Sequence, residues 1–390
     1  MTAKRVGILT GGGDVPGLNA TIKSAVARLI DAGREVVGIR RGWAGLLHLD
    51  PARGLDDPEW LRPLDRIATR AIDREGGTFL HTSRTNPALL ARERVPERLR
   101  SQLASIPGDG PVDFTDEAVR NVEALGLEAL IAIGGDGTLS FARRLDQEGV
   151  AVVGVPKTMD NDVAGTDYCI GFSTAVTRAV ALVNSLRTVA GSHERILVVE
   201  VFGRRSGEPC WMAAHLAGAD RAVVAEVPFD PAAVAQLAAR DRRENPSRYA
   251  VVLVSEGARA VGGEPFTRGR IDPAGNPRLG GVGEFLAREI ERREGVRTLD
   301  QSLAYLLRAG VPDAFDLLVA KSFGQLAAEL VLAGETGRLV AVEGGRYTAV
   351  PLARLGDTRP GLDVERFYDR AAYRPRIERL LDLPVFLHGF

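Results

Sequence analysis

Two short segments of the chain carry residues suited to phosphate chemistry. Gly-Gly-Asp-Gly-Thr occupies positions 134–138, directly after the apolar run 129–133. Pro-Lys-Thr-Met-Asp-Asn-Asp occupies positions 156–162, directly after a second apolar run at 152–155. Glycines between a strand and a helix let backbone N–H groups approach an anion, and a helix N-terminus favours negative charge. The spacing therefore predicts a phosphate-binding edge that also carries the carboxylates of Asp136, Asp160 and Asp162.

These carboxylates call for two different explanations. Asp136 stands in an otherwise positive setting, and Mg²⁺ is the hard cation that bridges carboxylate and phosphate oxygens, so we expect Asp136 to bind Mg²⁺. Asp160 and Asp162 lie two residues apart at the end of a predicted strand, close in sequence to Lys157. A phosphate cradle, a metal carboxylate, a lysine and paired aspartates together predict a phosphoryl-transfer site. An Asx turn after a strand is the structural alternative for the pair.

Taken in order, these motifs resemble those of the 6-phosphofructokinase family. Gly165-Thr166-Asp167-Tyr168 and Ile170-Gly171-Phe172 continue the resemblance, which covers about residues 5 to 335. It implies transfer of a phosphoryl group, from ATP or pyrophosphate with Mg²⁺, to the 1-hydroxyl of fructose 6-phosphate in glycolysis. In that reaction Asp160 would be the general base, with Asp162 near the metal or orienting Asp160. Thr158 would hydrogen-bond the acceptor.

The resemblance also implies which residues bind the phosphoryl donor. Gly12 lies in a glycine loop after the strand predicted at Arg5–Thr10, where the family contacts donor phosphates. Arg84 follows a second glycine segment and stands where the family has an arginine that bridges the transferred phosphate. Arginine suits that role because its planar fork stays charged and binds phosphate oxygens bidentately. A tight turn at Gly12 and a solvated loop arginine at Arg84 are the alternatives. The remaining donor contacts implied are Asp136, Gly137, Thr138 and Lys157.

Two of these residues bear on the identity of the donor. Family members that use pyrophosphate commonly have aspartate at the position of Gly137 and lysine at that of Lys157, whereas ATP users commonly have glycine at the first. This chain combines Gly137 with Lys157. An aspartate at 137 would crowd and repel the α-phosphate of a nucleotide, and a glycine leaves room for it. Gly137 therefore favours ATP, with pyrophosphate as the alternative donor.

A third group of residues matches the family's contacts to the sugar phosphate. Phe202, Gly203 and Arg204 match a hydrophobic–Gly–Arg triplet that touches the acceptor. Glu256 follows a predicted strand, where α/β proteins bind ligands, and matches an acidic contact to a sugar hydroxyl. Arg195 matches an arginine that reaches the acceptor phosphate of a neighbouring subunit. The resemblance therefore implies a homodimer or homotetramer whose active site is shared between subunits. A salt bridge at a strand edge is the alternative for Arg195.

The segment 299–310 departs from the pattern of the short bacterial members. Those members have a histidine followed by Gln-Arg-Gly-Gly, whereas here Tyr305 takes the place of the histidine and Arg308 remains. A tyrosine three residues before an arginine occurs in the long and the pyrophosphate-using branches. Both side chains can bind a sugar phosphate, because the phenol donates one hydrogen bond and the guanidinium supplies charge.

The elements that must position these residues alternate between apolar strands, glycine loops and amphipathic helices. This alternation predicts an α/β protein. The resemblance implies two similar doubly wound, Rossmann-like domains facing a cleft. We expect residues 1–171 plus about 311–335 to form the donor domain with ATP and Mg²⁺. Residues 172–310 plus about 336–390 would form the fructose 6-phosphate domain. The first glycine loop is not a dinucleotide fingerprint, because Pro16 stands where the third glycine would be needed.

Several local expectations complete the prediction. The segment 87–103 is predicted to be helical, and 260–278 to be a surface hairpin or loop. An amphipathic helix is expected from Asp363, and 384–387 is expected to pack against the protein. Trp43 stands where the family often has an aromatic residue near the nucleotide, and an exposed packing residue is the alternative.

Composition limits the other classes of function. The 390-residue chain has a formal net charge of −1, which argues against nucleic-acid binding by a basic surface. No run approaches 18 apolar residues, so no membrane span or signal peptide is expected. Two distant cysteines favour a reduced, cytoplasmic setting. NAD and diacylglycerol-type kinases share Gly-Gly-Asp-Gly-Thr but lack the second motif. A non-catalytic sugar-phosphate-binding homologue should have lost one of Asp136, Asp160 and Arg84.

Overall fold

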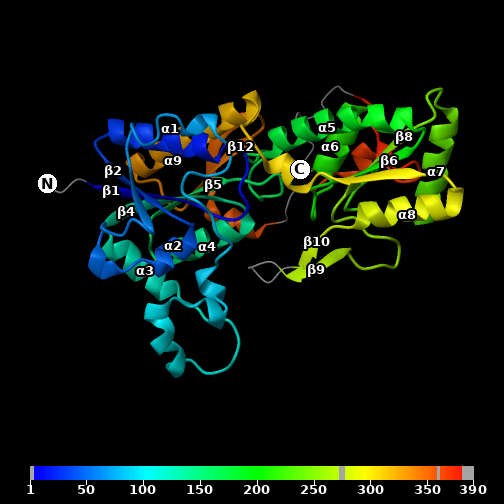
Figure 1. Cartoon of the computed structure of the whole chain (residues 1–390). Coiled ribbons are helices and arrows are strands. Elements are labelled where there is room, and N and C mark those ends of the chain that lie inside the picture. Colours follow the sequence, from blue (N-terminus) through cyan, green and yellow to red (C-terminus); the bar gives the residue numbers. More distant parts are fainter. Residues whose placement is uncertain (1–3, 272–276, 358–360, 380–390) are drawn as a thin grey trace. The chain divides into compact units, whose positions relative to one another are not determined.

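The computed structural model describes residues 4–271, 277–357 and 361–379. The chain divides into two compact α/β units, between which it passes repeatedly (Figure 1). Unit 1 comprises Met1–Thr158, Val163–Ile170 and Gly310–Thr358. Unit 2 comprises Met159–Asp162, Gly171–Ala309 and Arg359–Phe390. The predicted α/β class is confirmed, since each unit is built on a largely parallel sheet.

Unit 1 is built on a seven-stranded sheet in the order β13-β12-β5-β4-β1-β2-β3. The five inner strands run parallel, and β3 and β13 pair antiparallel at the two edges. Inner parallel strands are covered on both faces, which explains their continuous apolar sequences. The strands are β1 (Arg5–Thr10), β2 (Glu35–Ile39), β3 (Leu61–Leu64), β4 (Leu127–Gly134), β5 (Val152–Pro156), β12 (Arg338–Glu343) and β13 (Arg346–Pro351).

Helices cover both faces of this sheet. Figure 1 shows α1 and α9 side by side on one face, with α2, α3 and α4 on the other. Helices α1 and α9 approach closely at Gly324, where a Cβ atom would lie 2.3 Å from the carbonyl oxygen of Thr21. The helices are α1 (Leu18–Asp31), α2 (Trp43–His48), α3 (Thr115–Ala124), α4 (Asp136–Gln147) and α9 (Ala314–Ala333). No helix among the described residues combines the length and the apolar character that crossing a bilayer requires.

Unit 2 is built on a smaller sheet of four parallel strands in the order β11-β6-β8-β7. The strands are β6 (Ile196–Val201), β7 (Arg221–Val223), β8 (Ala250–Ser255) and β11 (Thr298–Ser302). Its helices are α5 (Phe172–Ser192), α6 (Glu208–Ala217), α7 (Pro231–Glu244) and α8 (Val282–Glu294). A two-stranded ribbon, β9 (Thr267–Ile271) with β10 (Pro277–Leu279), lies where a surface hairpin was predicted.

Residues 361–377, which we call the C-terminal strap, pack against unit 2. The strap contains one helical turn, α10 (Val364–Phe367), and a short ribbon of β14 (Tyr368–Asp369) and β15 (Arg374–Pro375). The Trp211 indole N–H donates to the Phe367 carbonyl at 2.6 Å, and the Tyr368 hydroxyl donates to the Ala222 carbonyl at 2.5 Å. These bonds attach the strap beside β7 and α6.

The structure corrects two predicted helices. Residues 87–103 form separate 3₁₀ turns, η3 (Pro87–Leu89), η4 (Arg92–Arg94) and η5 (Glu97–Ser105). Leu90 instead pairs with Val112 through two backbone hydrogen bonds of 2.8 and 2.9 Å, and Pro96 lacks the N–H that a continuous helix needs. The helix expected from Asp363 is limited to α10, because the chain then enters the β14–β15 ribbon. Residues 384–387 lie outside the described residues.

The unit boundaries differ from the predicted domains at two places. Strand β12 pairs with β5, with Leu339 opposite Gly154, so the segment that follows α9 completes the first sheet instead of joining the second unit. In the other direction, Met159–Asp162 belongs to unit 2 although its neighbours on both sides belong to unit 1. The predicted aspartate pair is thereby part of the unit that carries the predicted acceptor residues.

Candidate active site

The donor residues predicted in unit 1 follow three neighbouring strands. Strands β5, β4 and β1 are adjacent and parallel, so the loops after their carboxyl ends meet at one edge of the sheet. These loops hold Gly12, the segment from Gly135 to Thr138, and Lys157. Gly11 N–H donates to the Ile133 carbonyl at 2.9 Å, which joins the first glycine loop to the end of β4, directly before the second.

Thr138 lies between the two glycine loops. A Cβ atom at Gly11 would lie 2.3 Å from the Thr138 hydroxyl oxygen, and one at Gly134 would lie 2.3 Å from Thr138 Cβ. Only glycine allows this approach, so the two loops depend on each other's sequence. The Trp43 indole N–H donates to the Thr138 carbonyl at 3.2 Å, and Trp43 is buried rather than exposed. A donor contact by the Thr138 side chain stays a prediction.

Lys157 places a buried cation beside the same loops. Its side chain is 3% exposed, and its ammonium group donates to the Gly13 carbonyl at 2.6 Å. The ammonium nitrogen lies 3.3 Å from the position that a Cβ atom at Gly12 would occupy. Its backbone N–H donates to the Gly134 carbonyl at 2.9 Å, so Lys157 joins both loops. A positive charge held here is suited to the oxygens of a phosphate chain.

The segment that carries Arg84 is docked onto the first glycine loop. Gly12 N–H donates to the Ser83 carbonyl at 2.9 Å, and the Thr82 hydroxyl donates to the Gly12 carbonyl at 2.7 Å. Arg84 follows immediately and is exposed. The structure therefore brings the second glycine segment to the same edge as Gly12, and the contact of Arg84 with a transferred phosphate stays a prediction.

Asp136 is the first residue of α4, so its carboxylate stands at a helix N-terminus. Among the described residues no group of three or more histidine, cysteine or acidic side chains could hold a metal ion. Magnesium is commonly held by one or two carboxylates together with phosphate oxygens and water, and Asp136 fits that pattern. The next residue, Gly137, is exposed, and a Cβ atom built there would have no heavy atom within 4 Å.

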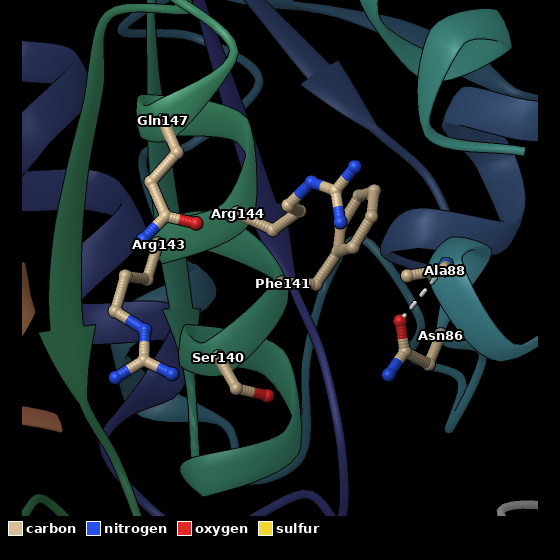
Figure 2. A pocket seen from close by; sticks show the side chains of 7 residues that line it. All are labelled: Asn86, Ala88, Ser140, Phe141, Arg143, Arg144 and Gln147. Atoms are coloured by element: carbon tan, nitrogen blue, oxygen red, sulfur yellow. Dashed lines mark hydrogen bonds between the residues drawn. The ribbon is translucent and has the colours of Figure 1, made fainter. Parts of the chain in front are cut away.

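A pocket of about 300 Å³ opens along α4, beyond the glycine loop. Figure 2 shows the Phe141 and Arg144 side chains extending from α4 toward Asn86 and Ala88. The Asn86 side chain accepts a hydrogen bond from the Ala88 N–H at 3.1 Å, which fixes that wall. The pocket is lined by Asn86, Ala88, Ser140, Phe141, Arg143, Arg144 and Gln147. It begins one helical turn after Gly137, so it lies next to the loop predicted to bind phosphate.

The acceptor residues predicted in unit 2 share the carboxyl edge of its sheet. Phe202–Arg204 follows β6, Glu256 follows β8, and η6 (Ala304–Arg308) follows β11. These three strands are adjacent and parallel, and Leu303 N–H donates to the Glu200 carbonyl at 2.9 Å. Tyr305 and Arg308 both lie in η6, and the guanidinium carbon of Arg308 lies 5.2 Å from the Tyr305 ring centre.

The loop from Gly203 to Gly207, which we call the acceptor loop, is anchored at its start by the end of β8. The Ser255 hydroxyl donates to the Gly203 carbonyl at 2.6 Å, and Gly257 N–H donates to the same oxygen at 3.2 Å. Gly203 has a φ of 134°, a conformation that favours glycine, and a Cβ atom there would lie 2.3 Å from the Ser255 hydroxyl oxygen. Glycine at 203 is therefore required by the fold, as well as by the family pattern.

Asp160 is held by this loop and has an unusual acidity. The Arg204 N–H donates to an Asp160 carboxylate oxygen at 3.3 Å. Burial raises the pKa of Asp160, and repulsion from the Asp162 and Glu256 carboxylates raises it further, to well above its ordinary value. The Arg204 N–H and guanidinium act in the opposite direction. The sequence alone supplied only the ordinary value of about 4, so the electrostatic setting makes Asp160 a stronger base than expected.

Arg195 does not join the other acceptor residues of its own chain. It immediately precedes β6, whereas Phe202 immediately follows it, and the six-residue strand separates them by roughly 20 Å. Arg195 lies near Glu291, whose pKa it helps to lower. Its predicted contact with a sugar phosphate therefore requires a different subunit, and remains a prediction.

Two buried polar residues that support these sites were not predicted. Asn19 is 3% exposed, donates to the Glu75 and Gly76 carbonyls, and accepts from the Phe79 N–H at 2.6 Å, so it holds the second glycine segment. Glu208 is fully buried and accepts a hydrogen bond of 3.3 Å from Asn161, the residue between the two aspartates. The sequence offered one signal for both residues. Asn19 and Glu208 are polar residues in the first turn of α1 and of α6, on helix faces that are otherwise apolar.

Comparison with known proteins agrees with this arrangement. The family model described as Phosphofructokinase matches residues 5–331. The chain belongs to the phosphofructokinase family. It is 41% identical over 356 residues to "ATP-dependent 6-phosphofructokinase 3" of Streptomyces coelicolor, covering 90% of this chain and 94% of the relative. It is 40% identical over 372 residues to "Pyrophosphate--fructose 6-phosphate 1-phosphotransferase" of Amycolatopsis methanolica, covering 95% of this chain and 99% of that one.

A solved phosphofructokinase shares the fold. The phosphofructokinase of Saccharomyces cerevisiae superposes with a TM-score of 0.71 at 25% identity over 90% of this chain. The match covers 45% of the yeast chain, so this protein spans less than half of its length. The phosphofructokinase fold predicted from the motifs is confirmed.

Proposed function

We propose that the protein transfers the γ-phosphoryl group of ATP to the 1-hydroxyl of fructose 6-phosphate, giving fructose 1,6-bisphosphate and ADP, as in glycolysis. The observation that carries this proposal is that the predicted donor residues gather at the carboxyl edge of one sheet and the predicted acceptor residues at the carboxyl edge of the other. One edge joins two glycine loops, a buried lysine and Arg84, as a phosphate chain requires. At the other, Asp160 accepts a hydrogen bond from the Arg204 N–H and is repelled by the carboxylate of Glu256, which follows β8.

In this reaction the acceptor oxygen loses its proton as it attacks phosphorus. Asp160 accepts that proton from the 1-hydroxyl, a new oxygen–phosphorus bond forms, and the bond from the γ-phosphorus to the bridging oxygen breaks. The raised pKa of Asp160 makes it better matched to this role than an ordinary aspartate, because general bases are most effective when their pKa approaches the working pH. Asp162 contributes by repelling the Asp160 charge, and so by keeping that pKa high.

The remaining residues position the substrates and neutralise charge. Arg84 and Lys157 would contact the transferring group and its leaving oxygens, where fixed positive charge stabilises the transition state. Asp136 would hold Mg²⁺, whose positive charge would offset the negative charge of the donor phosphates. Thr158 would hydrogen-bond the acceptor. The sugar phosphate would be bound by Phe202, Gly203, Arg204, Glu256, Tyr305 and Arg308.

The donor is assigned to ATP because the structure has room for more than a phosphate chain. Gly137 leaves open space at the end of the glycine loop, and the pocket along α4 begins one turn further on. A nucleoside attached to the phosphates would have a place there. The buried ammonium of Lys157 favours the second candidate, pyrophosphate-dependent transfer, because it adds positive charge close to the glycine loops.

We further propose a cytoplasmic homodimer or homotetramer in which Arg195 of one subunit contacts the sugar phosphate bound to another. The support is the position of Arg195, at the opposite end of β6 from Arg204. Dilution into conditions that yield monomers should then abolish turnover.

Initial rates decide between the two donors. Production of fructose 1,6-bisphosphate would be measured with ATP and with pyrophosphate at matched Mg²⁺ concentrations. We expect a higher kcat/KM with ATP. A higher value with pyrophosphate would reverse the donor assignment, and turnover with neither donor would refute the proposed activity.

A further inference from the structure

Glu226 connects the acceptor loop to the C-terminal strap. One carboxylate oxygen accepts the Gly207 N–H at 2.7 Å and the Leu362 N–H at 2.9 Å. Gly207 is the last residue before α6 and the end of the acceptor loop that carries Arg204. Leu362 belongs to the strap. A single carboxylate therefore holds two segments that lie 155 residues apart in sequence.

The second carboxylate oxygen of Glu226 is buried and makes no hydrogen bond to any described residue. It lies 2.3 Å from the position that a Cβ atom at Gly207 would occupy. Burial raises the pKa of Glu226, while the N–H groups of Gly207 and Leu362 lower it. A buried carboxylate with one unpaired oxygen is costly, so a role beyond apolar packing is indicated at this position.

The acceptor loop is anchored by the end of β8, by Asp160, by the first turn of α6 and by Glu226. Its first residue is held by the end of β8 through the Gly203 carbonyl, and the Arg204 N–H is held by Asp160. The N–H of its last residue, Gly207, donates to Glu226. Gly207 is also the N-cap of α6, where its carbonyl accepts the Trp211 N–H at 2.8 Å. Loss of the Glu226 bond would therefore loosen the loop between Arg204 and this cap, and so the position of the Arg204 side chain, without detaching the end of the loop.

We propose that Glu226 is a positioning residue for the acceptor: by joining Gly207 to the strap, it holds Arg204 where the phosphate of the sugar binds. This inference rests on the proposed function, since it assigns Arg204 to the sugar phosphate. It also assigns a task to the C-terminal strap, which supports the substrate-binding loop in addition to covering the edge of unit 2.

The test separates sugar binding from donor binding and from stability. Glu226→Ala removes both hydrogen bonds, and we expect it to raise the KM for fructose 6-phosphate about tenfold, as for loss of a charge-assisted hydrogen bond. The KM for the donor should stay within about twofold, and kcat within about threefold, on the same principle. Glu226→Gln keeps one oxygen that can accept both N–H groups, so it should restore most of the affinity.

A second variant reaches the same contact from the other side. Gly207 has a φ of −81°, which any residue adopts, so Gly207→Ala introduces no backbone strain. Its methyl group would lie 2.3 Å from the Glu226 carboxylate oxygen and 2.6 Å from Val224 Cβ, so it must displace both. We expect the same selective rise in the KM for fructose 6-phosphate, together with a lower Tm from the contact with Val224. Tyr373→Phe is the matched control, because it removes a different bond of the strap, the 3.0 Å contact with the Asp230 N–H. It should leave both KM values unchanged.

Thermal unfolding of each variant completes the experiment. A lower Tm with both KM values unchanged in Glu226→Ala would overturn the inference and leave Glu226 a structural clamp. An equal rise in both KM values would overturn it as well. These outcomes leave the proposed function intact, because they are measured against an active wild type. A wild type that phosphorylates fructose 6-phosphate with neither donor would overturn the proposed function, and this inference with it.

Discussion

Replacing Gly137 with aspartate should change the use of ATP without harming the fold. Gly137 is the second residue of α4, it is exposed, and a Cβ atom there has no heavy atom within 4 Å. The new side chain therefore meets no steric obstacle. A carboxylate in the first turn of a helix is favourable by about 0.3–1 kcal/mol. We expect the Tm of Gly137→Asp to equal or slightly exceed that of the wild type.

The substitution should instead weaken the binding of ATP, because the new carboxylate would repel the α-phosphate. Two unit charges about 6 Å apart repel by about 3 kcal/mol at an effective dielectric constant of about 20. This corresponds to roughly a hundredfold loss of affinity. Solvent screening at an exposed position reduces the effect, so we expect kcat/KM for ATP to fall at least about tenfold. Pyrophosphate has no α-phosphate in a nucleotide chain, and its use should fall less.

The assay couples product formation to a spectroscopic readout, with each donor varied at saturating fructose 6-phosphate and constant free Mg²⁺. Gly137→Asn is the matched control, because it has the same size as the aspartate and no charge. Equal losses in the two variants would show that crowding, not charge, is responsible. Retention of ATP activity within about threefold in Gly137→Asp would refute the reasoning, since the donor would then not pass this position.

Four further outcomes are expected. Asp160→Asn should lower kcat about 10²–10⁴-fold while sugar binding changes only a few-fold, and a kcat above about a tenth of wild type would exclude a general-base role. Arg204→Ala should raise the KM for fructose 6-phosphate far more than that for the donor, by loss of about 1.5–3 kcal/mol, and equal effects would contradict its assignment. Glu256→Gln removes a charge that raises the pKa of Asp160; because the base must be ionised, the acidic limb of the pH–rate profile should move to lower pH, and a limb that stays in place would contradict this. Regulation by a nucleoside diphosphate should be weak, because the resemblance to responsive short bacterial members implies two basic residues four apart on the first helix and here Lys23 is followed at that spacing by Ala27. The Lys23 ammonium is in addition bound to Asp73 at 2.7 Å, and sigmoidal kinetics relieved by such an effector would refute this prediction.

The features that the sequence predicted well are those encoded locally. Buried parallel strands are continuous apolar runs, and glycines mark the turns that follow them, so β1, β4 and β5 could be placed with their loops. The parallel arrangement then required the loops to meet, as they do at Gly11 and Thr138. The resemblance to the family supplied Phe202–Arg204 and Glu256, and the structure places both after adjacent strands of unit 2, whereas their contacts with the acceptor stay a prediction.

The features that it missed depend on partners far away in the chain. Apolar residues in 87–103 have helical spacing, but the pairing of Leu90 with Val112 prevails over that local preference. The pKa of Asp160 depends on Glu256, which lies 96 residues away. The contact of Glu226 with Leu362 is equally invisible to any local pattern. Propensity and motifs predict where strands, loops and candidate site residues lie along the chain. The tertiary contacts determine the pKa of Asp160 and the hydrogen bonds that hold the acceptor loop.

The repeated passage of the chain between the two units has a consequence for its synthesis. Strand β5 emerges from the ribosome ~180 residues before its edge partner β12, a delay of roughly 10–40 s at ordinary elongation rates. During that interval β5 presents an unpaired apolar edge, the kind of surface that promotes aggregation. Unit 2 must likewise wait for residues 361–377 before its own sheet is buttressed. Each unit is thus completed only after most of the other has been synthesised, and nascent chains of this protein should depend on chaperones more than those of a protein whose domains are contiguous.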